Sequence, residues 1–153
     1  MSRRAAWGRT TLTVALVVAL DQVTKKLARD GIRPGEEDAI FPALKLVNVR
    51  NEGVAFGIDA GGKTLVIALI ALALLALVLY FARHTAKPLI WLPTGLLVGG
   101  ALGNIVDRIR DGAVTDFLKI PAWPAFNVAD VAITLGVLAL VLVLERKPDE
   151  SQG

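Results

Sequence analysis

Long apolar runs alternate with shorter polar segments along this chain. The runs predict four helices, at about residues 8–28, 63–82, 88–107 and 127–145. A helix rises about 1.5 Å per residue and a bilayer core is about 30 Å thick, so a spanning helix needs about 20 mostly apolar residues. The second run, residues 64–82, meets that length without a charge. The pattern therefore predicts a mainly α-helical, polytopic membrane protein, with four transmembrane helices in a single domain over residues 1–153.

The first apolar run is too short to cross a bilayer alone. Residues 10–20 would form a helix of only about 17 Å, so a spanning helix must continue past Asp21 and Lys25. The basic start resembles a signal peptide, but no small-x-small cleavage site follows, so we expect an uncleaved helix. Asp21 and Lys25 lie four residues apart, on one helix face. Two interpretations of this pair remain open: a local ion pair that makes the burial of both charges tolerable, or a functional role.

The third run contains a repeat of small residues. Gly95, Gly99 and Gly103 are spaced four residues apart, a pattern that lets a neighbouring helix approach closely. Pro93, near the start of the same run, is expected to kink the helix. We therefore expect a neighbouring helix to pack closely against the third predicted helix.

Between the first two helices, the polar segment 29–62 predicts a small extramembrane sheet. Residues 43–58 are rich in β-branched side chains and partly alternate, with a turn signal at Asn51-Glu52-Gly53. We expect a two-stranded or curled sheet at the membrane face. Plain turn chemistry would account for Asn51 and Gly53.

Four spans place both termini on one side of the membrane. The segments on that side hold seven of the 17 Lys and Arg residues. A raw count of basic residues therefore does not favour a cytoplasmic location for the two termini. Much of the opposite excess lies in the long first loop, where the positive-inside rule weakens. Because residues 1–9 are short and dense in Arg, we expect both termini in the cytoplasm.

Composition narrows the possible chemistry. The chain is 54% hydrophobic with a net charge of +3, and its basic residues flank the apolar runs, which indicates membrane anchoring and no nucleic-acid partner. Cysteine is absent, histidine occurs once, and serine occurs only at Ser2 and Ser151. Nucleophilic Ser or Cys catalysis and a His-rich zinc site are therefore excluded, and no metal or cofactor is expected. Carboxylate chemistry remains.

Four of the 14 carboxylates lie in residues 99–130, at Asp107, Asp111, Asp116 and Asp130. Two aspartates that share one proton can act as base and acid on a water molecule, and Asp116 and Asp130 are the candidate pair. Pro121 and Pro124 prevent one helix from carrying both, so the chain should loop over the outer face between them. Asn104, Asp107 and Arg108 lie together on the preceding helix. They could support the pair or form a polar helix end satisfied by its own partners.

Five ordered motifs resemble bacterial lipoprotein signal peptidase, also called signal peptidase II. They are DQVTK at 21–25, NEGVAFG at 51–57, GGALGNIVDR at 99–108, VTDF at 114–117 and FNVAD at 126–130. Each alone would be weak, but their order and spacing cover nearly the whole chain from Asp21 onward. The connection between Asp116 and Asp130 looks shorter than in many members, which concerns loop shape and not chemistry.

The resemblance implies a membrane-embedded aspartic endopeptidase of the bacterial plasma membrane. Its substrates would be prolipoproteins, cleaved just before a cysteine that carries diacylglycerol, and its other partners membrane lipids. The active site would lie near the outer face of a monomer. By motif, Asp116 and Asp130 would be catalytic. The supporting or substrate-binding positions would be Asp21, Lys25, Asn51, Gly53, Asn104, Asp107, Arg108, Asn127 and Ala129. The family's extramembrane sheet and small helix would correspond to about residues 44–57 and part of the first loop.

Two other functions are compatible with polar residues in a helical bundle. A small transporter or ion-conducting bundle could use Asp21 and Asp130 as coordinating carboxylates. Such proteins typically have paired broken helices near mid-membrane, whereas the polar residues here gather at one end and no internal repeat is visible. A purely structural subunit would leave the costly Asn and Asp residues unexplained.

Overall fold

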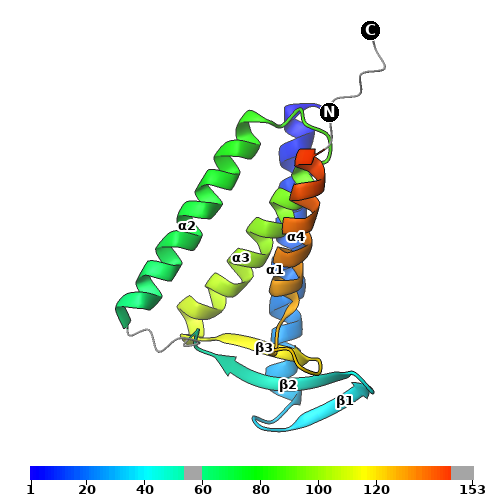
Figure 1. Ribbon diagram of the computed structural model, residues 1–153, viewed down its shortest axis with the longest axis vertical. Helices are drawn as coiled ribbons and strands as arrows, with labels where there is room; N and C mark the ends of the chain where they lie inside the picture. Colours follow the sequence, from blue (N-terminus) through cyan, green and yellow to red (C-terminus); the bar gives the residue numbers. More distant parts are fainter. Residues whose placement is uncertain (54–59, 146–153) are drawn as a thin grey trace.

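The computed structural model describes residues 1–53 and 60–145, and in that part the side chains of residues 1–53 and 68–145. Its elements, in chain order, are α1 (Arg3–Gly31), β1 (Glu37–Phe41), β2 (Leu44–Asn51), α2 (Ala60–Arg83), α3 (Trp91–Asp111), β3 (Val114–Lys119) and α4 (Val128–Glu145). In Figure 1 the small sheet lies across one end of the helices α1, α3 and α4. The start of α1 and the end of α4 lie at the opposite end.

Small residues on α3 allow α1 and α4 to pack closely against it. A Cβ at Gly99 would lie 2.8 Å from Val17 Cβ on α1, and a Cβ at Gly100 would lie 2.5 Å from the Ala129 carbonyl oxygen on α4. Real Cβ atoms do not occur at such distances, so only glycine fits. Gly95 and Gly103 face Thr13 and Asp21 of α1 in the same way. The close helix approach predicted from the glycine spacing is confirmed.

The outward faces of the helices are apolar. Leu16 on α1, Leu72 on α2 and Leu142 on α4 are each more than 60% exposed. Among the described residues, α4 has the length and apolarity to cross a bilayer, and residues 68–83 of α2 form a shorter apolar stretch. Rows of exposed leucines on several helices would be unstable in water but are ordinary in contact with lipid.

The three strands form an antiparallel sheet in the order β1-β2-β3. The turn at Pro42-Ala43 joins β1 to β2, and β3 pairs with β2 so that Asn51 lies opposite Val114 and Val49 opposite Asp116. Glu37 on β1 forms ion pairs with Lys45 and Lys119, tying the outer strand to both others. Hydrogen bonds from these lysines lower the pKa of Glu37 to about 2.

The sheet differs from the two-stranded prediction for residues 43–58. Its hairpin turn lies at Pro42-Ala43 and not at Asn51-Glu52-Gly53, and the third strand comes from the segment between α3 and α4, where a loop was expected. The described part of the first loop, residues 32–53, contains strands and no helix. The predicted positions 54–57 lie outside the described residues. Strand pairing depends on contacts distant in sequence, which a local pattern does not encode.

Pro93, which was expected to kink the third helix, lies near the start of that helix. α3 begins at Trp91, so Pro93 lies in its first turn. The N–H groups of a first turn have no intrahelical partner, so a proline there costs no hydrogen bond. At the other end, Gly112 adopts a left-handed conformation (φ 72°) and donates its N–H to the Arg108 carbonyl oxygen. This turn directs the chain from α3 into β3.

Candidate active site

Asp116 lies on β3, buried at 2% exposure, with both carboxylate oxygens hydrogen-bonded. The side-chain amide of Asn127 donates to Oδ1 at 2.7 Å, and that of Asn51 donates to Oδ2 at 2.9 Å. Burial raises the pKa of the Asp116 carboxyl, and the negative charge of Asp130 adds to this, while the two amides act in the opposite direction. Asp116 is therefore a carboxyl that holds its proton to a higher pH than usual.

Asp130 lies in the first turn of α4 and forms a reciprocal cap with Asn127. The Asn127 backbone N–H donates to Asp130 Oδ2 at 3.2 Å, and the Asp130 N–H donates to Asn127 Oδ1 at 3.0 Å. This is the arrangement of a capping box, which satisfies two N–H groups at a helix start. Because Asn127 also donates to Asp116, one fully buried side chain connects both aspartates.

Asn104 on α3 connects the pair to the interior of the bundle. Its amide nitrogen donates to Asp130 Oδ1 at 2.9 Å. Its amide oxygen accepts from Lys25 Nζ at 2.9 Å and from Asn127 Nδ2 at 3.2 Å. Asp116 and Asp130 thus share a continuous hydrogen-bonded network through Asn127 and Asn104, although they come from a strand and a helix.

Lys25 pairs with two buried carboxylates. Its Nζ lies 2.8 Å from Asp21 Oδ2 and 3.1 Å from Asp107 Oδ2, and all three side chains are fully buried. The local Asp21–Lys25 pair considered from the sequence is present, but it also links α1 to α3 through Asp107 and Asn104. A buried charge that has lost its partner is costly, so this arrangement holds the two helices together.

The remaining predicted site residues have different surroundings. Asn51 forms both the turn and the site, since its Oδ1 accepts the Gly53 N–H at 2.9 Å while its Nδ2 donates to Asp116. Gly53 has a positive φ of 72°, which the turn requires. Ala129 is fully buried and donates its backbone N–H to Asp21. Arg108 donates to the Asn104 backbone carbonyl on its own helix at 3.3 Å.

Two residues that the sequence interpretation did not assign also belong to this network. Gln22 donates its amide to Asp107 Oδ1 at 2.9 Å and to the Gly103 carbonyl at 3.2 Å. Thr115 donates its backbone N–H to Asp107 Oδ2 at 3.2 Å. The position of Gln22 beside Asp21 and three residues before Lys25 was an available signal. Thr115 acts through its backbone, so its side chain gives no signal.

Two hollows adjoin the network. An apolar groove of about 440 Å³ lies between α2 and the α3–α4 pair, with Leu74 and Ile133 among its lining and Asn104 and Arg108 at one edge. A second, more polar hollow of about 510 Å³ reaches Asp116 and includes Asn51 and the connection after β3.

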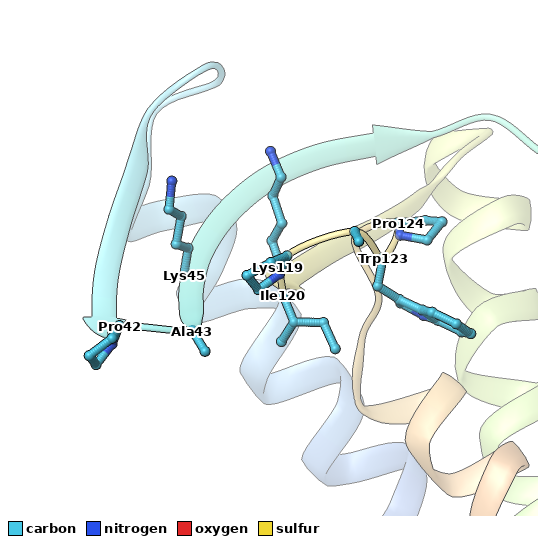
Figure 2. Close-up of a pocket in the computed structure, with 9 residues that line it drawn as sticks. Pro42, Ala43, Lys45, Lys119, Ile120, Trp123 and Pro124 are labelled. Atoms are coloured by element: carbon cyan, nitrogen blue, oxygen red, sulfur yellow. The ribbon is translucent and has the colours of Figure 1, made fainter.

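A third hollow, of about 530 Å³, lies between the β1–β2 turn and the β3–α4 connection (Figure 2), and neither Asp116 nor Asp130 lines it. Lys45 and Lys119 point together to one side of it, while Ile120 and Trp123 point to the other (Figure 2). Both lysines are paired with Glu37. None of the predicted site residues lines this hollow, so the chemistry is assigned to the buried network.

Comparison with known proteins agrees with the sequence resemblance. A family model described as signal peptidase (SPase) II matches residues 13–145. A lipoprotein signal peptidase of Syntrophomonas wolfei subsp. wolfei is 42% identical over 140 residues, which cover 90% of this chain and 91% of the relative. One from Halothermothrix orenii is 37% identical over 134 residues, covering 87% and 92%.

Two solved structures share the fold. Both are described as bacterial membrane enzymes solved by the in meso method, at 1.9 and 2.3 Å resolution. The first superposes with a TM-score of 0.82 at 33% identity, covering 92% of this chain and 95% of that one. The second has a TM-score of 0.81 at 31% identity, with 95% of both chains covered. A bundle that ends in a hydrogen-bonded network holding two aspartates, with these relatives, leads to one conclusion: the chain is a member of the signal peptidase II family of aspartic peptidases and a bacterial membrane enzyme.

Proposed function

We propose that Asp116 and Asp130 cleave the signal peptide from prolipoproteins just before a diacylglyceryl-modified cysteine. The observation that carries this proposal is the network through Asn127, which donates to Asp116 and caps Asp130 at the same time. Two carboxyls coupled in this way, one of them with a raised pKa, favour a singly protonated pair. That is the protonation state that an aspartic peptidase uses.

The reaction needs a stronger water nucleophile and a polarised amide. The ionised carboxylate of the pair takes a proton from water as the water oxygen attacks the scissile carbonyl carbon, and the protonated carboxyl polarises the carbonyl oxygen. Collapse of the tetrahedral intermediate breaks the C–N bond, and a proton passes to the leaving amine. Asn51, Asn104 and Asn127 orient the two carboxyls without exchanging protons, since amides do not titrate in this range.

The hollows beside the pair suggest where the substrate lies. The apolar groove between α2 and the α3–α4 pair suits the apolar part of a lipidated precursor. The polar hollow at Asp116 suits the chain that follows the cleavage site. The transporter alternative has no comparable support, because the polar side chains described here pair with one another at one end of the bundle.

The remaining features of the proposal concern placement in the membrane. The end of the bundle that holds the sheet and the pair would lie at the outer face of the plasma membrane, with both termini in the cytoplasm. Arg3, Arg4 and Arg9 at the start of α1 support that orientation. A monomer would be sufficient, because one chain supplies the pair and its polar partners. No metal or cofactor enters the proposed reaction.

Two matched precursors test this function. The purified full-length protein in detergent is incubated with a prolipoprotein that carries the diacylglyceryl group and with the same precursor left unmodified. We expect a gel shift for the lipidated form alone, with a product mass that places the cut immediately before the modified cysteine. Equal cleavage of both precursors, or a cut elsewhere, would contradict the proposed specificity.

A further inference from the structure

Two buried carboxylates each hold the backbone immediately before one of the paired aspartates. Asp107 Oδ2 accepts the N–H of Thr115, the residue before Asp116, at 3.2 Å. Asp21 Oδ1 accepts the N–H of Ala129, the residue before Asp130, at 2.9 Å. Both carboxylates are fully buried. The positions of β3 and of the first turn of α4 are therefore tied to these two side chains.

The ammonium group of Lys25 joins the two anchors. An ammonium has three protons, and Lys25 has three acceptors within hydrogen-bond distance. These are Asp21 Oδ2 at 2.8 Å, Asp107 Oδ2 at 3.1 Å and Asn104 Oδ1 at 2.9 Å. The third acceptor, Asn104, itself donates to Asp130. Lys25 thus reaches β3 through one carboxylate and α4 through the other carboxylate and an amide.

We propose that Lys25 is a positioning residue that sets the separation of Asp116 and Asp130. This inference rests on the proposed function, in which these two aspartates form the catalytic pair. Without the ammonium, two like-charged buried carboxylates face each other, and each must move or take up a proton. Either response shifts a backbone N–H that adjoins a catalytic carboxyl. Such a shift changes the distance between Asp116 and Asp130. The rate of the reaction is sensitive to that distance, because a misplacement of about 1 Å can reduce a rate about 100-fold.

A simpler role would be to tether α1 to α3. A tether affects how much protein folds but leaves the rate constant of each folded molecule unchanged. The two roles also predict different effects on β3. A tether between α1 and α3 gives no reason for a change at Asp21 to affect β3, whereas a positioning role does. Asp21 has no hydrogen bond to Thr115. It is connected to Asp107, the acceptor of the Thr115 N–H, through Lys25 and through the Gln22 amide, which lies 3.2 Å from Asp21 Oδ2 and 2.9 Å from Asp107 Oδ1.

Amide hydrogen exchange of Asp21→Asn tests the coupling without substrate. Asparagine keeps the size of the side chain and an acceptor for the Ala129 N–H, but it lacks the charge that holds Lys25. We expect exchange at the Thr115 N–H to accelerate about tenfold or more, together with that of Ala129. The buried Ala132 N–H of α4 serves as the internal reference and should stay within about twofold of wild type. An unchanged Thr115 rate, or equal acceleration at Ala132, would overturn the proposal.

Kinetics of Lys25→Met provide the second measurement, with Lys26→Met as the matched control. Lys26 is the next residue of the same helix, is 70% exposed and pairs only with Asp30 in the set of described ion pairs. For Lys25→Met we expect kcat per folded molecule to fall about 100-fold while KM for a lipidated peptide stays within about threefold. Lys26→Met should match wild type. A kcat for Lys25→Met within about threefold of wild type would refute the positioning role.

The exchange experiment is independent of the proposed reaction. If Asp116→Asn remained active, the catalytic pair would be wrongly assigned, yet the coupling between Asp21 and Thr115 would still be measurable. If Asp116 and Asp130 proved essential but Asp21→Asn left exchange at Thr115 unchanged, the role of Lys25 would be refuted and the catalytic pair would stand.

Discussion

Replacing Asn104 by alanine should weaken catalysis without abolishing it. The substitution removes three hydrogen bonds, namely the one that the amide donates to Asp130 at 2.9 Å and those that it accepts from Lys25 and Asn127. Asp116 and Asp130 both remain, as do the hydrogen bonds of Asn127 to each of them. The variant should therefore lose part of the orientation of the Asp130 carboxyl and keep the groups that transfer protons.

The hydrogen bond to the Asp130 carboxylate sets the size of the loss. Hydrogen bonds to charged groups contribute about 1.5–3 kcal/mol, and 1.36 kcal/mol corresponds to a tenfold change in rate. If that contribution is made in the transition state, kcat/KM should fall about 10- to 150-fold. Removing a general acid or base typically costs about 100- to 10,000-fold, and an Asp→Asn substitution in the pair removes a group that serves as both.

The assay is single-turnover cleavage of a lipidated peptide, normalised to folded protein. Asn48→Ala is the matched control, because Asn48 donates to the Ile32 carbonyl at 2.8 Å and has no described hydrogen bond to either aspartate. Its kcat/KM should equal that of wild type. If Asn104→Ala were as inactive as a variant of the pair, or as active as Asn48→Ala, its assignment as an orienting residue would be wrong.

Three further predictions concern packing, chemistry and pH. Gly99→Leu should overpack the α1–α3 contact at a cost of at least about 1–3 kcal/mol, because even a Cβ at this position lies 3.3 Å from Val14 Cα. Size-exclusion chromatography should show loss of monodisperse protein. The control Gly8→Leu, with open space around its Cβ, should behave as wild type. Cleavage should survive EDTA and reagents directed at serine and cysteine, and inhibition by a chelator that zinc or magnesium reverses would contradict an aspartic mechanism. Because the pKa of Asp116 is raised from 3.8, the folded state binds its proton more tightly than the unfolded chain, so this residue lowers stability as pH rises through the raised value. The melting temperature of Asp116→Asn relative to wild type should therefore increase from about pH 4 to about pH 8, and a difference independent of pH would refute this.

The helices were predictable from the sequence because lipid imposes a local rule on them. A run such as residues 64–82 must be apolar and helical wherever it lies in the bundle, since every backbone polar group needs an internal partner in the bilayer. The spacing of Gly99 and Gly103 is likewise a local pattern, and by itself it indicates a close helix contact.

The sheet was harder to predict from the sequence, since the paired strands β2 and β3 lie far apart in the chain. Val114 and Phe117 are strand-forming residues bounded by Gly112 and Pro121, a local signal that was available for β3. Nothing in that signal indicates that β3 pairs with β2, which places Asn51 beside Asp116. The turn interpretation of Asn51 was correct but incomplete, because the amide oxygen forms the turn and the amide nitrogen binds the aspartate.

The polar network shows a second limit of sequence reasoning. Asp21 and Lys25 share a helix face, so their ion pair could be predicted. Their third partner, Asp107, comes from another helix, and the anchors at Thr115 and Ala129 are backbone N–H groups that any residue except proline would supply. Side-chain identity carries no information about such contacts.

The central claim is that Asp116 and Asp130 form the catalytic pair, and their asparagine variants test it most directly. Cleavage of a lipidated prolipoprotein is measured for Asp116→Asn, Asp130→Asn and the control Asp111→Asn, each purified and shown to be folded. Asp111 lies at the end of α3 and pairs with the exposed Arg110. The account predicts that each variant of the pair loses more than about 1,000-fold in activity yet still binds the uncleaved precursor, while Asp111→Asn keeps most of its activity. An active Asp130→Asn, or equal losses at Asp111 and Asp116, would show that the wrong pair had been identified.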